Sequence, residues 1–549
     1  MREWFRSGSP WVWLNAGAVS VCLVMVVGLI LLIAFRGLSH FWPSDITQLY
    51  YLEEDGNAHR LIGEIVDHEQ VPRERVEDLG ASLPEDVIVV DRYLLKIGNR
   101  EFFGIDFRWI AGPSIINQAH PGHIMAIERH EWGNLYGYLV ALKENGEVIH
   151  SDKPNWDLLQ DRLSRKHTLS KEIRHVEKDL VGAINYRMEK LRLKERGLEL
   201  EGIVDRAAYR HIDTERAHLQ DQYDQLTQRL AELYEAIDRD SVVVEIADER
   251  EVEVPVAQIV RAYQPNRMGL FDRLRFYFTK LWEFVAEEPR EANTEGGIFP
   301  AIFGTVLMVM IMSVFVTPFG VVAAVYLREY AKQGLLTQLI RIAVNNLAGV
   351  PSIVYGVFGL GFFVYILGGN IDQLFFREAL PAPTFGTPGL IWASLTLAIL
   401  TVPVVIVATE EGLSRIPRAI REGSLALGAT KAETLWRTVL PMTAPAMITG
   451  LILAVARAAG EVAPLMMVGV VKLAPSLATD GNFPYLHLDR KFMHLGFHIY
   501  DVGFQSPNVE AARPLVYATA LLLVLLIIVL NLTAIYIRNR LREKYNAAE

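Results

Sequence analysis

Cysteine is almost absent from this sequence, since Cys22 is the only one among 549 residues. A single thiol excludes an intrachain disulfide and any metal centre built from several cysteines. Basic residues are also in the minority, with 54 Lys and Arg against 64 Asp and Glu and a formal net charge of −10. This balance argues against a nucleic-acid partner, because nucleic-acid binding usually needs a basic patch.

A nucleotide-binding loop is missing as well. Gly423 and Gly428 have the glycine spacing of such a loop, but Ala429 stands where its lysine must be. Without that lysine no side chain reaches the β- and γ-phosphates of ATP. We therefore expect no cofactor and no enzymatic activity in this chain, so that any energy from ATP must come from a partner.

No spacing of residues predicts a metal site. Three histidines, His120, His123 and His130, form a loose group, but histidines in solvated loops explain this grouping better than a metal centre with ordered ligands does.

Hydrophobic residues make up 51% of the chain and charged residues 21%, which predicts a membrane part beside a sizeable soluble part. The first apolar run, Trp11–Phe35, has about 25 residues and would form roughly 37 Å of helix, more than the ~30 Å of a bilayer's hydrocarbon core. No small-residue cleavage site follows it, so we interpret residues 1–36 as an uncleaved anchor. Five further spans are expected within residues 294–549, at Ile298–Leu327, Ala343–Leu367, Leu390–Ala408, Ala444–Val471 and Pro514–Ile537.

The positive charges between these runs support six spans. With six spans all the basic groups fall on one face of the membrane, which the positive-inside rule identifies as cytoplasmic. Both termini and residues 411–441 are then cytoplasmic, and residues 37–293 lie on the other side. The groups are Arg2 and Arg6; Arg328, Lys332 and Arg341; Arg415, Arg418, Arg421, Lys431 and Arg437; and Arg538, Arg540, Arg542 and Lys544.

Residues 37–293 contain no spanning run and predict an inserted α+β domain. Strand-like segments occur at Val87–Val90, Tyr93–Ile97, Tyr136–Leu142 and Ser241–Val256, with turn signals at Gly98-Asn99 and Asn145-Gly146. Residues 155–239 have helical periodicity and break near Gly197–Gly202, which predicts a long antiparallel hairpin. Its two apolar seams are Leu219, Tyr223, Leu226, Leu230, Leu233 and Ile237, and Leu169, Ile173, Val176, Leu180, Ile184 and Met188. An amphipathic segment, Arg273–Trp282, leads into the second span.

The polar stretch Glu422–Pro441 separates two spans and organises the rest of the chain. We expect two short helices that turn on Gly428, because glycine adopts the positive φ that such a reversal needs. Pro441 suits the first turn of the next helix, where its missing N–H does no harm.

This stretch resembles the cytoplasmic coupling loop of ABC importer permeases of type I, whose pattern is E-A-A, three residues, Gly, nine residues, Ile, one residue, Leu-Pro. Glu422-Gly423-Ser424 stands for E-A-A, Gly428 for the glycine, and Leu440-Pro441 for the end. Gly423 and Ser424 replace the alanines and Thr438 replaces the isoleucine. The resemblance implies that this loop, within residues 411–441, couples the chain to an ATPase.

Two ionisable residues lie within the fifth expected span. Arg457 and Glu461 are four residues apart, so they share a helix face and could form an ion pair. A charge near the bilayer centre costs at least ~2.5–3.5 kcal/mol, so such groups usually line a polar path or bind something. Arginine also suits a tetrahedral oxyanion, because its planar fork donates in pairs and stays charged. Both a substrate path and a structural ion pair remain open.

The same stretch, Ala456–Leu465, together with Pro351–Gly356 and Gly304–Tyr330, resembles the permease subunits of phosphate-specific ABC importers. Residues 37–293 look like the long periplasmic insertion of some bacterial members. The resemblance implies import of inorganic phosphate across the bacterial inner membrane, within membrane lipid. The implied partners are a second, homologous permease that forms a heterodimer, a cytoplasmic ATPase dimer and a periplasmic phosphate-binding protein.

Two alternatives remain. Arginine would accept sulfate, molybdate or phosphonate as readily as phosphate, so the residues alone leave the oxyanion open. A membrane sensor or scaffold built on the external helical hairpin is the other possibility, because long coiled hairpins suit tethering.

Overall fold

Six long apolar helices dominate the part of the chain that the computed structural model describes, which is residues 7, 9–52, 57–73, 89–151, 153–506 and 509–546. The chain divides into two units, which we call the membrane unit (Met1–His40 and Phe284–Glu549) and the inserted unit (Phe41–Glu283). The charges of Arg2 and Arg6 and the predicted strand residues Val87 and Ile88 lie outside the described residues.

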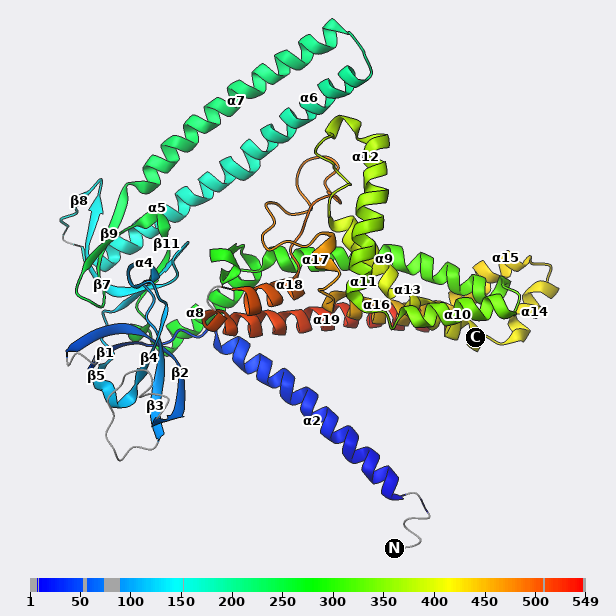
Figure 1. Cartoon of the computed structure of the whole chain (residues 1–549), viewed down its shortest axis with the longest axis horizontal. Coiled ribbons are helices and arrows are strands. Elements are labelled where there is room, and N and C mark those ends of the chain that lie inside the picture. The colour runs from blue at the N-terminus through cyan, green and yellow to red at the C-terminus, as the bar shows by residue number, and fades with distance from the viewer. Residues whose placement is uncertain are drawn as a thin grey trace. The chain divides into compact units, whose positions relative to one another are not determined.

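Each of the six helices is long and apolar enough to cross a bilayer, so the prediction of six spans is confirmed. Two of them contain a π-helical segment between α-helical parts, and a third ends in one. Figure 1 labels the α-helical parts. The helices are α2 (Ser9–Ser39); α9 (Phe299–Val325), extended by the π-turn Tyr326–Tyr330; α11 (Ser352–Phe358) and α12 (Gly369–Phe375), joined by the π-turn Gly359–Gly368; α13 (Leu390–Arg415); α15 (Lys431–Thr434) and α16 (Leu440–Gly460), joined by the π-turn Leu435–Val439; and α19 (Val509–Asn546).

The bounds of two spans differ from those expected. The third begins at Ser352 rather than Ala343, because Pro351 ends the preceding helix and residues before a proline avoid the α conformation. The residues from Ala343 to Leu347 belong instead to the separate amphipathic helix α10 (Leu335–Leu347). The fifth span runs from Lys431 to Gly460 rather than from Ala444 to Val471.

Pro441 lies in the first turn of α16, as predicted, but α16 is joined to α15 through a π-turn in one continuous span. A proline in a helix removes one backbone hydrogen bond and clashes with the carbonyl four residues earlier. Here the π-turn Leu435–Val439 directly precedes it and changes the local hydrogen-bond pattern, so the helix continues through the proline.

Shorter elements connect the spans of the membrane unit. These are α14 (Arg418–Ala426), α17 (Leu465–Val468), α18 (Leu495–Tyr500) with the π-turn Asp501–Gln505, the 3₁₀ turns Glu291–Asn293 and Arg377–Ala379, and the paired strands β12 (Pro289–Arg290) and β13 (Glu295–Gly296).

Helix α13 lies at the centre of the membrane unit and is its most buried span. It packs against α9 and α16 in a core of Met308, Met312, Leu397, Val405 and Ala454 with their neighbours. Small residues let the backbones approach, as in many membrane helix pairs. At Gly412 an added Cβ would lie 2.4 Å from the Cβ of Ala446, so only glycine fits there.

Two antiparallel sheets form the body of the inserted unit. The first has the order β4-β3-β2-β1-β5, and the second β10-β9-β7-β6-β11, with β8 paired to β7. The turn Asn145-Gly146 joins β7 to β8 with positive φ at both residues, as predicted. The strands are β1 (Ile46–Leu52), β2 (Ala58–Pro72), β3 (Val89–Lys96), β4 (Phe107–Ala111), β5 (Ile115–Ala119), β6 (Met125–Arg129), β7 (Leu135–Glu144), β8 (Glu147–Val148), β9 (Asp240–Glu245), β10 (Glu251–Pro255) and β11 (Ile259–Tyr263).

A long helical hairpin separates β8 from β9. Its first arm joins α5 (Asn155–Arg174), the π-turn His175–Val181 and α6 (Gly182–Leu200), and its second arm is α7 (Arg206–Asp238) (Figure 1). The predicted seam residue Leu180 is 40% exposed, and Val181 packs in the seam instead. The π-turn explains the shift, because it adds one residue to the turn and moves the apolar stripe along by one position.

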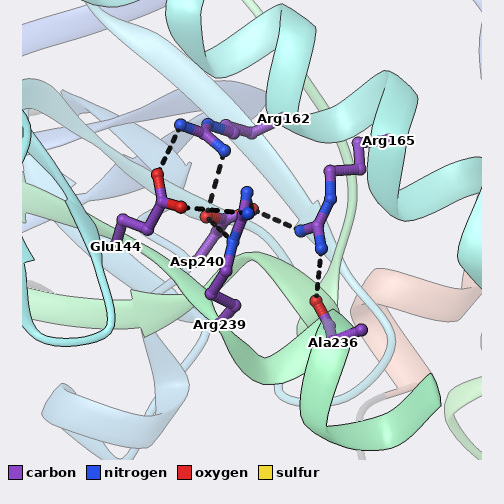
Figure 2. Close-up of polar contacts among 6 residues, drawn as sticks. All are labelled: Glu144, Arg162, Arg165, Ala236, Arg239 and Asp240. Atoms are coloured by element: carbon purple, nitrogen blue, oxygen red, sulfur yellow. Dashed lines mark hydrogen bonds and ion pairs between the residues drawn. The ribbon is translucent and has the colours of Figure 1, made fainter. Parts of the chain in front are cut away.

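A network of charges holds the base of the hairpin on the second sheet (Figure 2). The Asp240 carboxylate is buried and accepts hydrogen bonds from Arg165 Nη1 at 2.9 Å and Arg239 Nε at 3.0 Å. Glu144 pairs with Arg162 and with Arg239, at 2.7 and 2.9 Å. Both arms of the hairpin and two neighbouring strands are thus joined through five side chains.

Two further helices complete the described fold. Helix α4 (Arg100–Phe103) follows β3, and the amphipathic helix α8 (Leu270–Ala286) connects the two units. Short 3₁₀ turns occur at Gly112–Ser114, Val256–Gln258 and Pro265–Arg267.

Candidate functional site

The two ionisable residues of the fifth span form an ion pair at the end of α16, where the helix stops. Arg457 lies in the last turn, and Glu461 follows the last helical residue with extended backbone angles of φ −79° and ψ 133°. Arg457 Nε lies 3.5 Å from Glu461 Oε1, and both side chains are half-buried. The expected position within a longer helix was wrong, because the helix ends at Gly460 and Pro464 follows.

Two features of this end of α16 stabilise and position the Arg457 side chain. Carbonyl groups at a helix C-terminus carry partial negative charge, which stabilises the Arg457 guanidinium. The chain after Glu461 also packs tightly against the third span, since an added Cβ at Gly356 would lie 2.7 Å from Pro464 Cα. The ion pair is therefore fixed close to the contact between two spans, with part of each side chain still accessible.

The polar stretch between α13 and α16 folds as two short helices that reverse at Gly428, whose φ is +89°. We call residues 418–439, from the start of α14 through α15 to the end of the π-turn Leu435–Val439, the coupling element. It is shorter than the expected loop 411–441, because α13 continues to Arg415, and its part from Lys431 onward belongs to the next span. Leu440 and Pro441 accordingly lie within that span.

Apolar and polar contacts hold the coupling element on the spans. Leu435 and Val439 bury their side chains against Leu413 and Ile416 of the α13 end. Ser424, one of the matched motif residues, lies 2.9 Å from the Thr434 hydroxyl and so joins α14 to α15.

Glu329 links both short helices to the end of α9. Its carboxylate accepts from Arg421 Nη2 at 2.9 Å, and its carbonyl oxygen accepts from Lys431 Nζ. Arg421 also donates to the carbonyls of Leu413 and Ile416. Three spans thus meet at the coupling element.

The outer surface of the coupling element is unusually apolar for a polar stretch. Leu427 is 91% exposed and Trp436 is 76% exposed, with Leu425 beside them. The matched residues Glu422 and Gly423 are also exposed, and an added Cβ at Gly423 would meet nothing within 4 Å. Exposed apolar clusters on soluble surfaces usually mark contact sites.

Sequence reasoning missed a group of buried polar residues between α17 and α19. The Asp501 carboxylate lies 3.2 Å from Lys472 Nζ, and Asn293 donates to the Lys472 carbonyl at 2.8 Å. His494 and His498 are also buried, and burial lowers their pKa values to about 3 and about 4. The spacing of His494, His498 and Asp501 by four and three residues was the available signal.

Of the histidines considered in the sequence, His120 and His123 lie in the loop between β5 and β6, and His130 directly follows β6. His120 Nδ1 lies 3.3 Å from Thr47 Oγ1, and His130 Nε2 lies 3.1 Å from Lys166 Nζ. Within the described ranges, no three His, Cys, Asp or Glu side chains are placed so that they could hold a metal ion.

Comparison with known proteins identifies the family. Residues 316–543 match the model of the binding-protein-dependent transport system inner membrane component. The chain is 34% identical over 247 residues to the phosphate transport system permease protein PstA 1 of Mycobacterium tuberculosis, which covers 44% of this chain and 71% of the relative. The chain belongs to this family of transport permeases.

Two other relatives are matched over most of their length. The permease is 30% identical over 296 residues to the probable phosphate transport system permease protein PstC of Methanocaldococcus jannaschii, covering 52% of this chain and 88% of the relative. It is 28% identical over 273 residues to the probable ABC transporter permease protein YqgI of Bacillus subtilis, covering 48% and 86%. The predicted resemblance to phosphate ABC permeases is thereby confirmed. The inserted unit lies outside the residues that match the family model.

Proposed function

We propose that this permease is the membrane subunit of an ATP-driven importer of inorganic phosphate. The names of its relatives PstA 1 and PstC support phosphate as the cargo. The observation that carries the proposal is the half-buried Arg457–Glu461 pair at the end of a span. In this proposal a phosphate oxyanion displaces Glu461 and accepts paired hydrogen bonds from the Arg457 guanidinium.

The coupling element transmits the energy of ATP hydrolysis. A cytoplasmic ATPase dimer would bind the exposed Leu427 and Trp436 together with Glu422 and Gly423. Ser424 and Gly428 keep the shape of the element, and Leu440 and Pro441 belong to the span that it moves. Rigid-body rocking of the spans would then open the path to each side in turn.

Orientation and partners follow from the charge distribution and the family. Both termini and the coupling element are cytoplasmic in this proposal, and the inserted unit is periplasmic. A second, homologous permease completes a heterodimer, and a periplasmic phosphate-binding protein delivers the substrate. The hairpin α5–α7 would hold that binding protein near the permease, so its deletion should reduce uptake.

The decisive experiment measures ATP hydrolysis and phosphate uptake in proteoliposomes that contain the whole complex. Arg457→Gln removes a charged bidentate donor worth about 3 kcal/mol, so uptake should fall about 100-fold while the complex still assembles. Arg250→Gln, an exposed arginine in the turn between β9 and β10 and outside the hairpin, is the matched control and should leave uptake unchanged.

Three results would contradict the proposal. Normal uptake in Arg457→Gln would remove this residue from the path. Transport of sulfate, molybdate or phosphonate in preference to phosphate would change the cargo. Purification of the chain without any ATPase would favour a sensor or scaffold built on the hairpin.

A further inference from the structure

Helix α8 exposes a continuous apolar stripe that the proposed transport function does not use. Its residues recur every three or four positions, so they lie on one face of the helix. Phe271 is 81% exposed and Trp282 is 72% exposed, in a helix that is otherwise rich in charge. The stripe consists of Leu270, Phe271, Leu274, Phe278 and Trp282.

The opposite face of α8 is held on the inserted unit by ion pairs. Lys280 donates to Glu128, Glu283 accepts from Arg261, and Arg273 donates to Asp45. These contacts fix the rotation of the helix about its own axis. The apolar stripe is therefore turned away from the sheets by the fold itself.

The ends of the two spans that flank the inserted unit, α2 and α9, are both linked to α8. At its C-terminal end the Phe284 carbonyl accepts from Ile298 N at 2.8 Å, one residue before the span α9 begins. In its middle the Tyr277 ring packs on Phe41 and Trp42, with ring centroids 6.5 and 6.1 Å away, two and three residues after the span α2 ends. Short segments of chain thus connect α8 to both of these spans.

The composition of the stripe also suits lipid. Tryptophan is enriched where a bilayer meets water, and a long basic side chain beside an apolar face can reach the headgroups. Arg275 is exposed and lies at the border of the stripe, one helical turn after Phe271. The other basic residues of the helix, Arg273 and Lys280, are held in ion pairs, so attraction to anionic lipid contributes little.

We infer that α8 lies in the membrane surface on the side of the inserted unit, with Leu270, Phe271, Leu274, Phe278 and Trp282 among the lipid chains. Interfacial helices bury such a face roughly 5–10 Å into the boundary between headgroups and acyl chains. The lipid thereby anchors the inserted unit, independently of the substrate that is transported.

The lone cysteine makes a direct test possible. In a Cys22→Ser background, a single cysteine at Phe278 carries an environment-sensitive fluorophore, and the full chain is placed in nanodiscs. Quenching by lipids that carry bromine on the upper acyl chain is compared with quenching by aqueous iodide. Val204→Cys is the matched control in the hairpin turn, an apolar residue that is 87% exposed, and Val529→Cys reports a span.

The inference predicts that brominated lipid quenches the probe at 278 several-fold more than the probe at 204, and that iodide does the reverse. Neutral and anionic lipids should give similar results. Quenching at 278 by iodide alone would show a solvent-exposed stripe and overturn the inference. Protection from both quenchers would show that a protein covers the stripe, which would overturn it equally. A label at Trp282 repeats the measurement if the Phe278 variant does not fold.

Discussion

Removal of one exposed ring on the coupling element gives the sharpest test of its proposed role. Trp436 is 76% exposed although it lies on a helix that is otherwise anchored in a buried cluster. Burial of roughly 150 Å² of this side chain, at about 25 cal/mol per Å², is worth about 4 kcal/mol. Ordering the side chain and imperfect fit reduce the net contribution to about 2 kcal/mol.

Trp436→Ala should therefore weaken binding of the ATPase about 30-fold. The assay titrates purified ATPase onto the permease in nanodiscs and measures the dissociation constant. Leu427→Ala should weaken binding in the same direction by a smaller factor, since leucine buries less surface. Val204→Ala is the control, because this residue is equally exposed but lies in the inserted unit.

An unchanged dissociation constant in both Trp436→Ala and Leu427→Ala would refute the assignment of this surface to the ATPase. A change in the Val204→Ala control would show that exposed apolar residues act non-specifically in the assay. The effect of Trp436→Ala should persist at high salt, because the contact is apolar.

Two further predictions concern stability. Asp240→Asn removes a carboxylate that lies among Arg162, Arg165 and Arg239. These arginines keep partial access to water and to Glu144. The base of the hairpin should therefore lose about 2 kcal/mol of stability, less than the full cost of a broken buried pair. Amide exchange in α5 and β9 should then be roughly 30-fold faster, whereas Glu189→Gln, in an exposed pair, should change nothing measurable. The lowered pKa of His498, about 4 against an ordinary 6.5, means that the unfolded chain binds its proton first, so stability is full above pH 6.5 and falls between pH 6.5 and 4. At pH 5.5 this histidine should lower the free energy of unfolding by about 1 kcal/mol relative to pH 7. Thermal unfolding of His498→Leu should depend less on pH in this range, and an identical pH profile would contradict the assignment.

The spans were predictable because a run of apolar residues needs no knowledge of tertiary contacts. The ends of the spans were harder to predict. The sequence suggests a helix from Ala343, but Pro351 divides it. Pro441 lies in the first turn of α16 as expected, but the π-turn before it joins α16 to α15 in one span. Such turns have no simple signature, as Leu180 and Val181 also show: one added residue exchanged their positions in the hairpin seam.

The inserted sheets were only partly foreseen. Strands β3, β7, β9 and β10 fall in runs of β-type residues, but β1, β2, β4, β5, β6 and β11 did not stand out in the sequence. Antiparallel strands depend on partners far along the chain, for example Ile46 with Glu64, so their local pattern is weak. At the candidate site the pairing of Arg457 with Glu461 was predictable from their spacing, whereas the end of the helix between them was not.

The unbroken helix from Lys431 to Gly460 has a mechanical consequence. Lys431 and Arg457 lie near opposite ends of this helix, roughly 39 Å apart at 1.5 Å per residue. Its compliant points, the π-turn and the prolines Pro441 and Pro445, all lie in the half next to Lys431. Beyond Pro445 the helix is stiff, so a tilt imposed on this part of it reaches the Arg457 guanidinium undiminished. A further proline near Leu453 would absorb that tilt.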